Sequence, residues 1–92
     1  MYVASAKLTF YIHQSTSLKD KRQVRRSIID RARRRFNASV AEVGDQDLHR
    51  TLTLGVSVVS GNAGHARNSL DEIIRFMEDN PDAELTDIEH II

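Results

Sequence analysis

The sequence predicts an α+β protein made of one ferredoxin-like domain, a four-stranded antiparallel sheet that carries two helices on one face. Its segments follow the order β-α-β-β-α-β, which is the order of the split βαβ arrangement. Right-handed crossovers then place both helices on one side of the sheet and the first and third strands at its centre. The 92 residues are 40% apolar, enough for one core and too few for a second domain, so residues 1–92 form a single domain.

The first strand and the start of the first helix are well marked in the sequence. Residues 2–13 alternate between apolar and polar side chains, the pattern of a half-buried strand. Ser17-Leu18-Lys19-Asp20 then has the form of a capping box, with a hydroxyl at the N-cap and a carboxylate three residues later. We therefore expect the first helix to begin after Ser17.

An apolar stripe predicts the buried side of this first helix. Its members recur at four-residue steps: Val24, Ile28, Ala32 and Phe36. Arg25 falls inside the stripe on a helical wheel. We expect the stem of Arg25 to pack and its guanidinium to reach the helix edge. A buried ion pair with an acid of another chain is the alternative.

The remaining elements follow in short segments. A strand is expected over residues 38–43, a turn at Gly44-Asp45-Gln46-Asp47, and a third, alternating strand over 50–60. Ser60-Gly61-Asn62 then begins the second helix.

Asn80-Pro81 ends this second helix, because proline disfavours a helical conformation in the residue before it. A last strand is expected over residues 83–89, but its alternation does not assign its faces.

Charge is distributed very unevenly along the chain. The formal net charge is zero, with 13 basic and 13 acidic residues. Residues 17–36 hold nine of the basic residues and only two acids, whereas residues 71–92 hold eight acids and one arginine. The distribution of charge bears on the partners of a protein more than its total does. It indicates that a basic helix is available to an anionic partner.

The spacing of the basic residues predicts a nucleic-acid contact on the first helix. Four of them share one solvent-facing strip, and two more extend it at the helix C-terminus: Lys19, Arg22, Arg26, Arg33, and then Arg34 and Arg35. Such a strip can follow successive phosphates and release their counterions. A subunit or protein interface, a solvated face, and ion pairing with the acids of the second helix are the alternatives.

A small-anion site is a further candidate. We expect both helices to begin at the same edge of the sheet, which would bring two sets of unpaired backbone N–H groups together. The candidate residues are Ser15, Thr16, Ser17, Gly61, Asn62 and His65, with added charge from Lys19, Lys21 and Arg67. The alternative is that Ser17 and Asn62 only cap their helices.

No catalytic or cofactor motif is present, so we expect a protein that is not an enzyme and holds no cofactor. Asp45-x-Asp47-x-His49 has a conceivable metal spacing, but an Asp-rich hairpin followed by one histidine is typical of a turn, and we expect no metal. The loop His13–Arg22 lacks the glycine-rich phosphate cradle of the acylphosphatases, and no Walker motif is present.

The sheet face opposite the helices is expected to be uncovered. It carries mostly small polar side chains: Lys7, Thr9, Tyr11, Thr51, Thr53 and Ser57. RNA-recognition motifs stack bases on aromatics of such a face, but only Tyr11 qualifies here. An uncovered face and opposite charges on one molecule favour self-association, so we expect a homo-oligomer, most simply a dimer.

The segments SLKDKRQVRRSIIDRARRRFNASVAEVGDQDL and LTLGVSVVS together resemble the YlxP-like family of small uncharacterised bacterial proteins. The resemblance covers essentially the whole chain. It implies a ferredoxin-like fold and a bacterial cytoplasmic protein, and it supplies no catalytic residues. Family genes often lie among genes for translation and ribosome maturation, which implies a role with RNA.

The leading functional hypothesis is therefore a non-enzymatic, RNA- or ribosome-associated factor that binds phosphates through its first helix. The alternative is a dimeric interaction module whose basic helix docks on an acidic surface. A cytoplasmic location is expected, because the chain has no cysteine and no apolar run near the roughly 20 residues that a bilayer-spanning helix needs.

Overall fold

The computed structural model describes residues 1–92 and contains six elements. In chain order they are β1 (Tyr2–Tyr11), α1 (Leu18–Arg35), β2 (Ser39–Gly44), β3 (Thr51–Ser60), α2 (Ala63–Glu78) and β4 (Glu84–His90). The expected order is confirmed. The largest difference in a boundary is at the end of β1, which stops at Tyr11 and not at His13.

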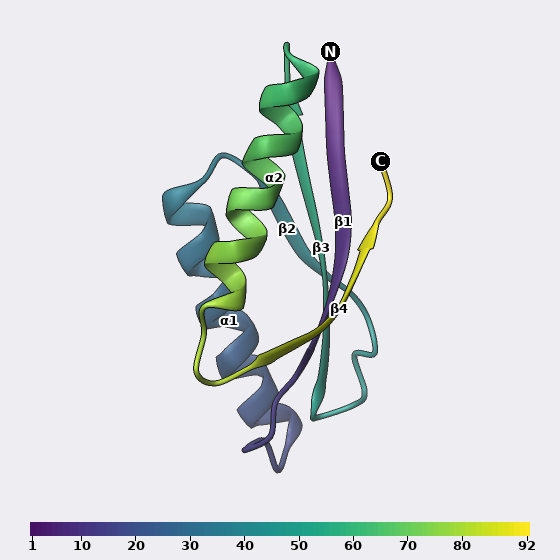
Figure 1. The fold of residues 1–92 in the computed structure, drawn as a ribbon. Helices are drawn as coiled ribbons and strands as arrows, with labels where there is room; N and C mark the ends of the chain where they lie inside the picture. The colour runs from purple at the N-terminus through teal and green to yellow at the C-terminus, as the bar shows by residue number, and fades with distance from the viewer.

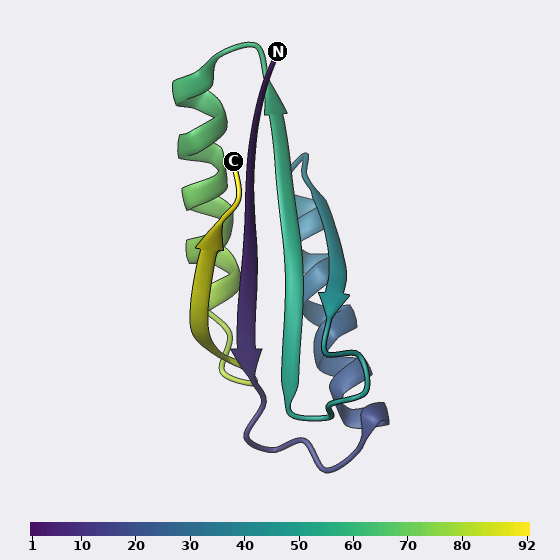
Figure 2. The same cartoon turned by 90° about the vertical axis from the view of Figure 1, so that its right-hand side faces the viewer.

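The four strands form one antiparallel sheet in the order β2-β3-β1-β4, so β1 and β3 are central, as expected. Figure 2 looks onto the face of this sheet that no helix covers. Tyr2 lies opposite Ser60 and Tyr11 lies opposite Thr51, so the two central strands pair along their whole length.

Both helices pack on the other face of the sheet (Figure 1). α1 lies against β2, and α2 lies across β1 and β3. Even-numbered residues of the two central strands meet the apolar stripes of the helices, and the most completely buried side chains include Leu8, Phe10, Leu52, Leu54, Leu70, Ile73 and Met77. The expected stripe of α1 is confirmed, with Ile28 and Ala32 buried and with Val24 and Phe36 partly buried against the core.

The last strand shows why its pattern is ambiguous in the sequence. Leu85 lies opposite Phe10 and Ile88 lies opposite Leu8, so both belong to the helix side of the sheet. They are three residues apart instead of two or four, because the register shifts between Thr9 and Phe10. A bulge of this kind adds one residue to one strand and breaks its alternation.

Both helix N-termini are capped by the expected residues. The Ser17 hydroxyl accepts a hydrogen bond from the Asp20 backbone N–H at 3.1 Å, and the Asn62 side-chain oxygen accepts one from the His65 N–H at 2.9 Å. The Asp20 carboxylate accepts from the backbone N–H and the hydroxyl of Thr16, not from Ser17. These bonds from Thr16 lower the pKa of Asp20.

Candidate functional site

Seven basic side chains of α1 project into solvent. We call this set the basic face: Lys19, Arg22, Arg26, Arg31, Arg33, Arg34 and Arg35, all of which are exposed. Six of the seven are the residues that the sequence proposes for phosphate contact. Arg31 is the addition.

The basic face has no acidic partner within the chain. Only three ion pairs of lysine or arginine are present, and they join Lys7 to Glu89 and both Lys21 and Arg25 to Glu42; His13 bonds to Glu84. The alternative that α1 pairs with the acids of α2 is therefore wrong for Asp71, Glu72, Glu78 and Asp79. Seven positive charges remain available to an external anion.

The fold separates these cations from the acids of β4. α1 packs against β2, which forms one edge of the sheet, whereas β4 forms the opposite edge. Figure 2 shows α1 behind β2 on one side and β4 on the other. The acids of β4, which are Glu84, Asp87 and Glu89, therefore lie across the width of the molecule from the basic face.

Two arginines of the basic face lie over aromatic rings. The guanidinium carbon of Arg31 is 5.7 Å from the ring centre of Phe76, and that of Arg35 is 5.1 Å from the same ring. Arg35 also lies 5.7 Å from the ring centre of Phe36, which meets Phe76 edge to face. These cation–π contacts restrict both side chains before any partner arrives. Phe76 therefore belongs to the candidate site, and its position on α2 hides this from a sequence pattern.

Arg33 differs from its neighbours on the basic face. Its Nη2 donates a hydrogen bond to the Val40 carbonyl at 2.7 Å, which ties the last turn of α1 to β2. Part of its donor capacity is thus used by the fold. Arg22 and Arg26 make no such contact and are the better residues for testing a phosphate contact.

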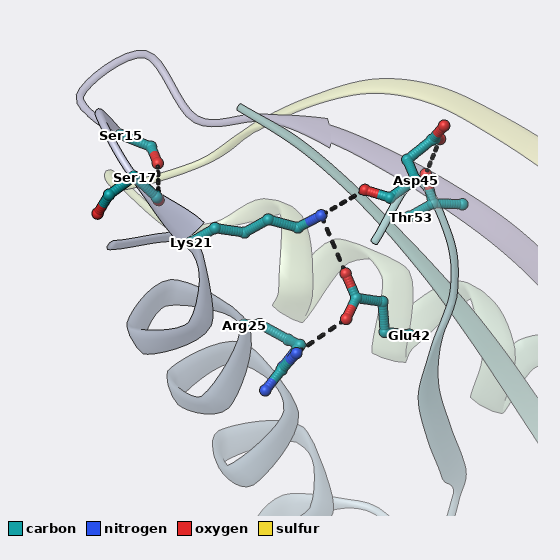
Figure 3. Close-up of polar contacts among 7 residues, drawn as sticks. All are labelled: Ser15, Ser17, Lys21, Arg25, Glu42, Asp45 and Thr53. Atoms are coloured by element: carbon teal, nitrogen blue, oxygen red, sulfur yellow. Dashed lines mark hydrogen bonds and ion pairs between the residues drawn. The ribbon is translucent and has the colours of Figure 1, made fainter. Parts of the chain in front are cut away.

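A cluster of three charged residues lies beneath the start of α1 (Figure 3). Lys21 Nζ is 3.0 Å from Glu42 Oε2 and also donates a hydrogen bond to the Asp45 carbonyl at 2.6 Å. Arg25 Nη1 donates to Glu42 Oε1 at 2.9 Å. The side chain of Lys21 is 2% exposed and that of Glu42 is 10% exposed, so the cluster is internal.

This cluster corrects two sequence expectations. Lys21 cannot add charge to an anion site on the surface, because it is buried and already paired. Arg25 is partly exposed, and its guanidinium, expected at the helix edge, meets Glu42 of β2 within the same chain and not an acid of another chain. The signal was available: Lys21 precedes Val24 by three residues and Ile28 by seven, which places it in the same stripe.

Glu42 remains ionised in this environment. Burial alone would raise the pKa of its carboxyl, and that is the largest single effect. The contacts with Lys21 and Arg25 outweigh it together, so the pKa of Glu42 is lower than its ordinary value. The cluster is thus a set of charges at neutral pH.

The expected anion site at two neighbouring helix N-termini is wrong. β1 and β3 are antiparallel neighbours, so their C-terminal ends lie at opposite ends of the sheet along the strand direction. The two starts are separated by about the length of a ten-residue strand, roughly 33 Å; Figure 1 shows them at opposite ends of the molecule. Ser15, Thr16 and Ser17 lie at one end, and Gly61, Asn62 and His65 lie at the other.

Local bonds account for these residues. The buried Ser15 hydroxyl donates to the Ser17 carbonyl, and Arg50 Nε donates to the Ser15 carbonyl. At the other helix, the Ser60 hydroxyl bonds to His65 Nδ1 and accepts from the Asn62 N–H. Ser17 and Asn62 cap their helices, which was the alternative.

Asp45 serves the β2–β3 turn. Its backbone has a positive φ of 53°, a conformation that aspartate tolerates better than most residues. Its carboxylate accepts a hydrogen bond from the Thr53 hydroxyl at 2.7 Å, and its carbonyl receives the bond from Lys21. No group of three or more His, Cys, Asp or Glu side chains lies in an arrangement that could hold a metal ion.

Comparisons with known proteins identify the family. Residues 3–90 match the model of a family described as Protein of unknown function (DUF503). The chain belongs to this family. One relative, the Uncharacterized protein YlxP of Bacillus subtilis (strain 168), is 32% identical over 75 residues, which are 82% of this chain and 82% of the relative. The YlxP-like resemblance is confirmed.

A solved structure agrees with the fold. A de novo designed protein with a ferredoxin fold, determined by solution NMR, superposes with a TM-score of 0.63 at 16% identity. The match covers 100% of this chain and 87% of the designed one. At that identity it supports the ferredoxin-like architecture alone. Neither helix of this DUF503 protein has the length and apolar composition to cross a membrane.

Proposed function

We propose that this protein is a non-enzymatic RNA- or ribosome-associated factor, and that the basic face of α1 binds the phosphate backbone. The observation that carries the proposal is that seven exposed cations on one helix have no acidic partner in the chain. A phosphate row satisfies such cations and releases its own counterions on binding. The translation-related gene neighbourhood that the YlxP-like resemblance implies favours RNA among the anionic polymers.

The geometry of the helix sets the extent of the contact. Lys19 and Arg33 are fourteen residues apart, so the solvent-facing strip that they bound extends about 21 Å along α1. Arg22 and Arg26 occupy the middle of the strip, and Arg34 and Arg35 lengthen it at the C-terminus. Contacts of this kind orient a nucleic acid without identifying its bases, so we expect little sequence selectivity.

The test compares two double variants that change the net charge equally. The first is Arg22→Glu with Arg26→Glu, on the basic face. The control is Arg67→Glu with Arg75→Glu, on the exposed surface of α2. Fluorescence anisotropy with labelled ribosomal RNA fragments, titrated between about 50 and 200 mM salt, gives affinity and salt slope for each.

We expect the first variant to weaken binding to all fragments alike and to reduce the salt slope by about 0.7 to 0.9 for each lost contact. The control should stay close to the wild type. Equal losses in both variants would show a general charge effect and no site on α1. Wild-type protein that binds no RNA at 50 mM salt would refute the proposal and leave the basic face as a docking surface for an acidic protein.

A further inference from the structure

The uncovered face of the sheet is less polar than the sequence suggests. Three large aliphatic side chains project from it: Val43 is 54% exposed, Val59 is 61% exposed and Ile91 is 57% exposed. They come from β2, β3 and the residue after β4, so they are spread over much of the face. Val43 and Ile91 line one hollow, and exposed aliphatic groups that lie together in this way indicate an interaction surface.

A hollow of about 350 Å³ is lined by two of these groups. Its floor is made of small residues, and Val43, Lys7 and Ile91 are among its lining. Gly55 is essential to this shape, because a Cβ at that position would lie 2.9 Å from Val43 Cγ1. Because Gly55 has no side chain, the Val43 side chain can pack over the backbone of β3 beside the hollow.

We infer that this face binds the same face of a second copy of the chain. A twofold dimer needs one patch that is complementary to itself. Projecting aliphatic groups and a hollow of small residues on one surface meet that need, because each copy offers both parts. The inference does not depend on RNA binding.

Charge disfavours one alternative, a contact between the helix layers of two copies. At the hollow, Lys7 is already paired with Glu89 at 3.2 Å. Two such faces can therefore meet without placing two unpaired lysines opposite each other. The helix layer carries the seven cations of the basic face, and a contact between two copies through α1 would bring these cations together. Stacking through the sheets leaves both α1 helices on the outside.

The area of the face is small for a dimer interface. Strands of ten, ten, seven and six residues cover about 500 Å² per face, at 3.3 Å per residue and 4.8 Å between strands. Two faces together bury on the order of 1,000 Å², which is at the lower limit for a specific interface. We therefore expect a weak, reversible dimer.

Sedimentation equilibrium without RNA, from about 1 µM to about 1 mM chain, tests this inference. The wild-type mass should rise from 10.4 kDa toward twice that value. Ala41→Arg places a long charged side chain in the hollow, and Val59→Arg replaces a projecting group on another strand. Asn68→Arg makes the same charge change on the exposed surface of α2 and is the control.

We expect both sheet variants to remain at 10.4 kDa where the wild type and the control dimerise, with unchanged circular dichroism spectra. A wild type that stays monomeric at all concentrations would overturn the inference. So would a dimer that survives both sheet variants, or one that 1 M salt dissociates, since salt would implicate the charged surfaces. Two independent variants guard against one that fails to fold.

Discussion

Lys21 and Glu42 form an ion pair inside the protein, with 3.0 Å between Nζ and Oε2. The pair joins the first turn of α1 to β2, and the Asp45 carbonyl accepts a second bond from the same lysine. Charges so far removed from water are tolerated only when they are paired. The contact therefore fixes the position of α1 over the β2–β3 turn.

Lys21→Ala is expected to destabilise the fold by about 3 kcal/mol, because it leaves a buried carboxylate with only one cationic partner. Urea denaturation at pH 7 measures the free energy of unfolding. Lys19→Ala is the matched control, two residues away and exposed, and should change that free energy by no more than about 0.5 kcal/mol. Similar losses in both variants would mean that the internal pair does not stabilise the fold.

Stability should fall in acid partly through Glu42. Its pKa in the folded protein lies below the ordinary value of 4.5, so the unfolded chain binds this proton more readily. The contribution of Glu42 is complete above the unfolded-state pKa and is lost as the pH falls through the folded-state pKa. Glu42→Gln should be less stable at pH 7 and should lose less stability between pH 5 and pH 3.

The measurement is the free energy of unfolding from urea titrations at several pH values for the wild type and Glu42→Gln. The pKa of Asp20 is also lowered, by its bonds from Thr16, but this residue is present in both proteins. The difference between the two curves therefore isolates Glu42. Curves that run parallel down to pH 3 would contradict the prediction.

Phe76→Leu should weaken RNA binding about five-fold, which corresponds to about 1 kcal/mol, since Arg31 and Arg35 lose the ring that restrains them. Phe36→Leu is the comparison, because Phe36 meets Arg35 and not Arg31. Its effect on the same anisotropy titration should be smaller. Equal affinities of Phe76→Leu and the wild type would show that the two arginines need no prior ordering.

Tyr11→Ala should leave RNA affinity within about 1 kcal/mol of the wild type, the lower end of the value of one stacked base. Tyr11 is half-buried on the uncovered face and meets His13 edge to face, and the strand opposite it offers threonine. The same titration serves for this variant. A larger loss would move the binding site from α1 to the sheet.

Much of the fold is predictable from local patterns. Alternation marks β1 and β3, Ser17 and Asn62 mark the helix starts, and Asn80-Pro81 marks the end of α2. The face assignment of β4 is not predictable, because the bulge opposite Thr9 and Phe10 breaks its period.

The candidate site is predictable only in part. The exposed cations follow from helical spacing, and so does the inward position of Lys21, since it shares the stripe of Val24. Helical spacing does not predict the partner of Lys21, because Glu42 is 21 residues away and its position depends on how β2 packs against α1. The prediction that the two helix N-termini lie together was wrong for another reason. Adjacent antiparallel strands have their C-terminal ends at opposite ends of the sheet, which the expected topology already implied.

The separation of the α1 cations from the acids of β4 affects how the protein responds to dilute salt. At physiological ionic strength the screening length is about 8 Å. That length is less than the two shorter dimensions of the molecule, 22 and 16 Å, so salt screens the repulsion between a polyanion at α1 and the acids of β4. At 0.01 M it is about 30 Å, and those acids then repel the same polyanion. As the salt is diluted, the logarithm of the RNA affinity should therefore rise less steeply than counterion release alone predicts. The protein should also approach a polyanion with its α1 side and not with its β4 side.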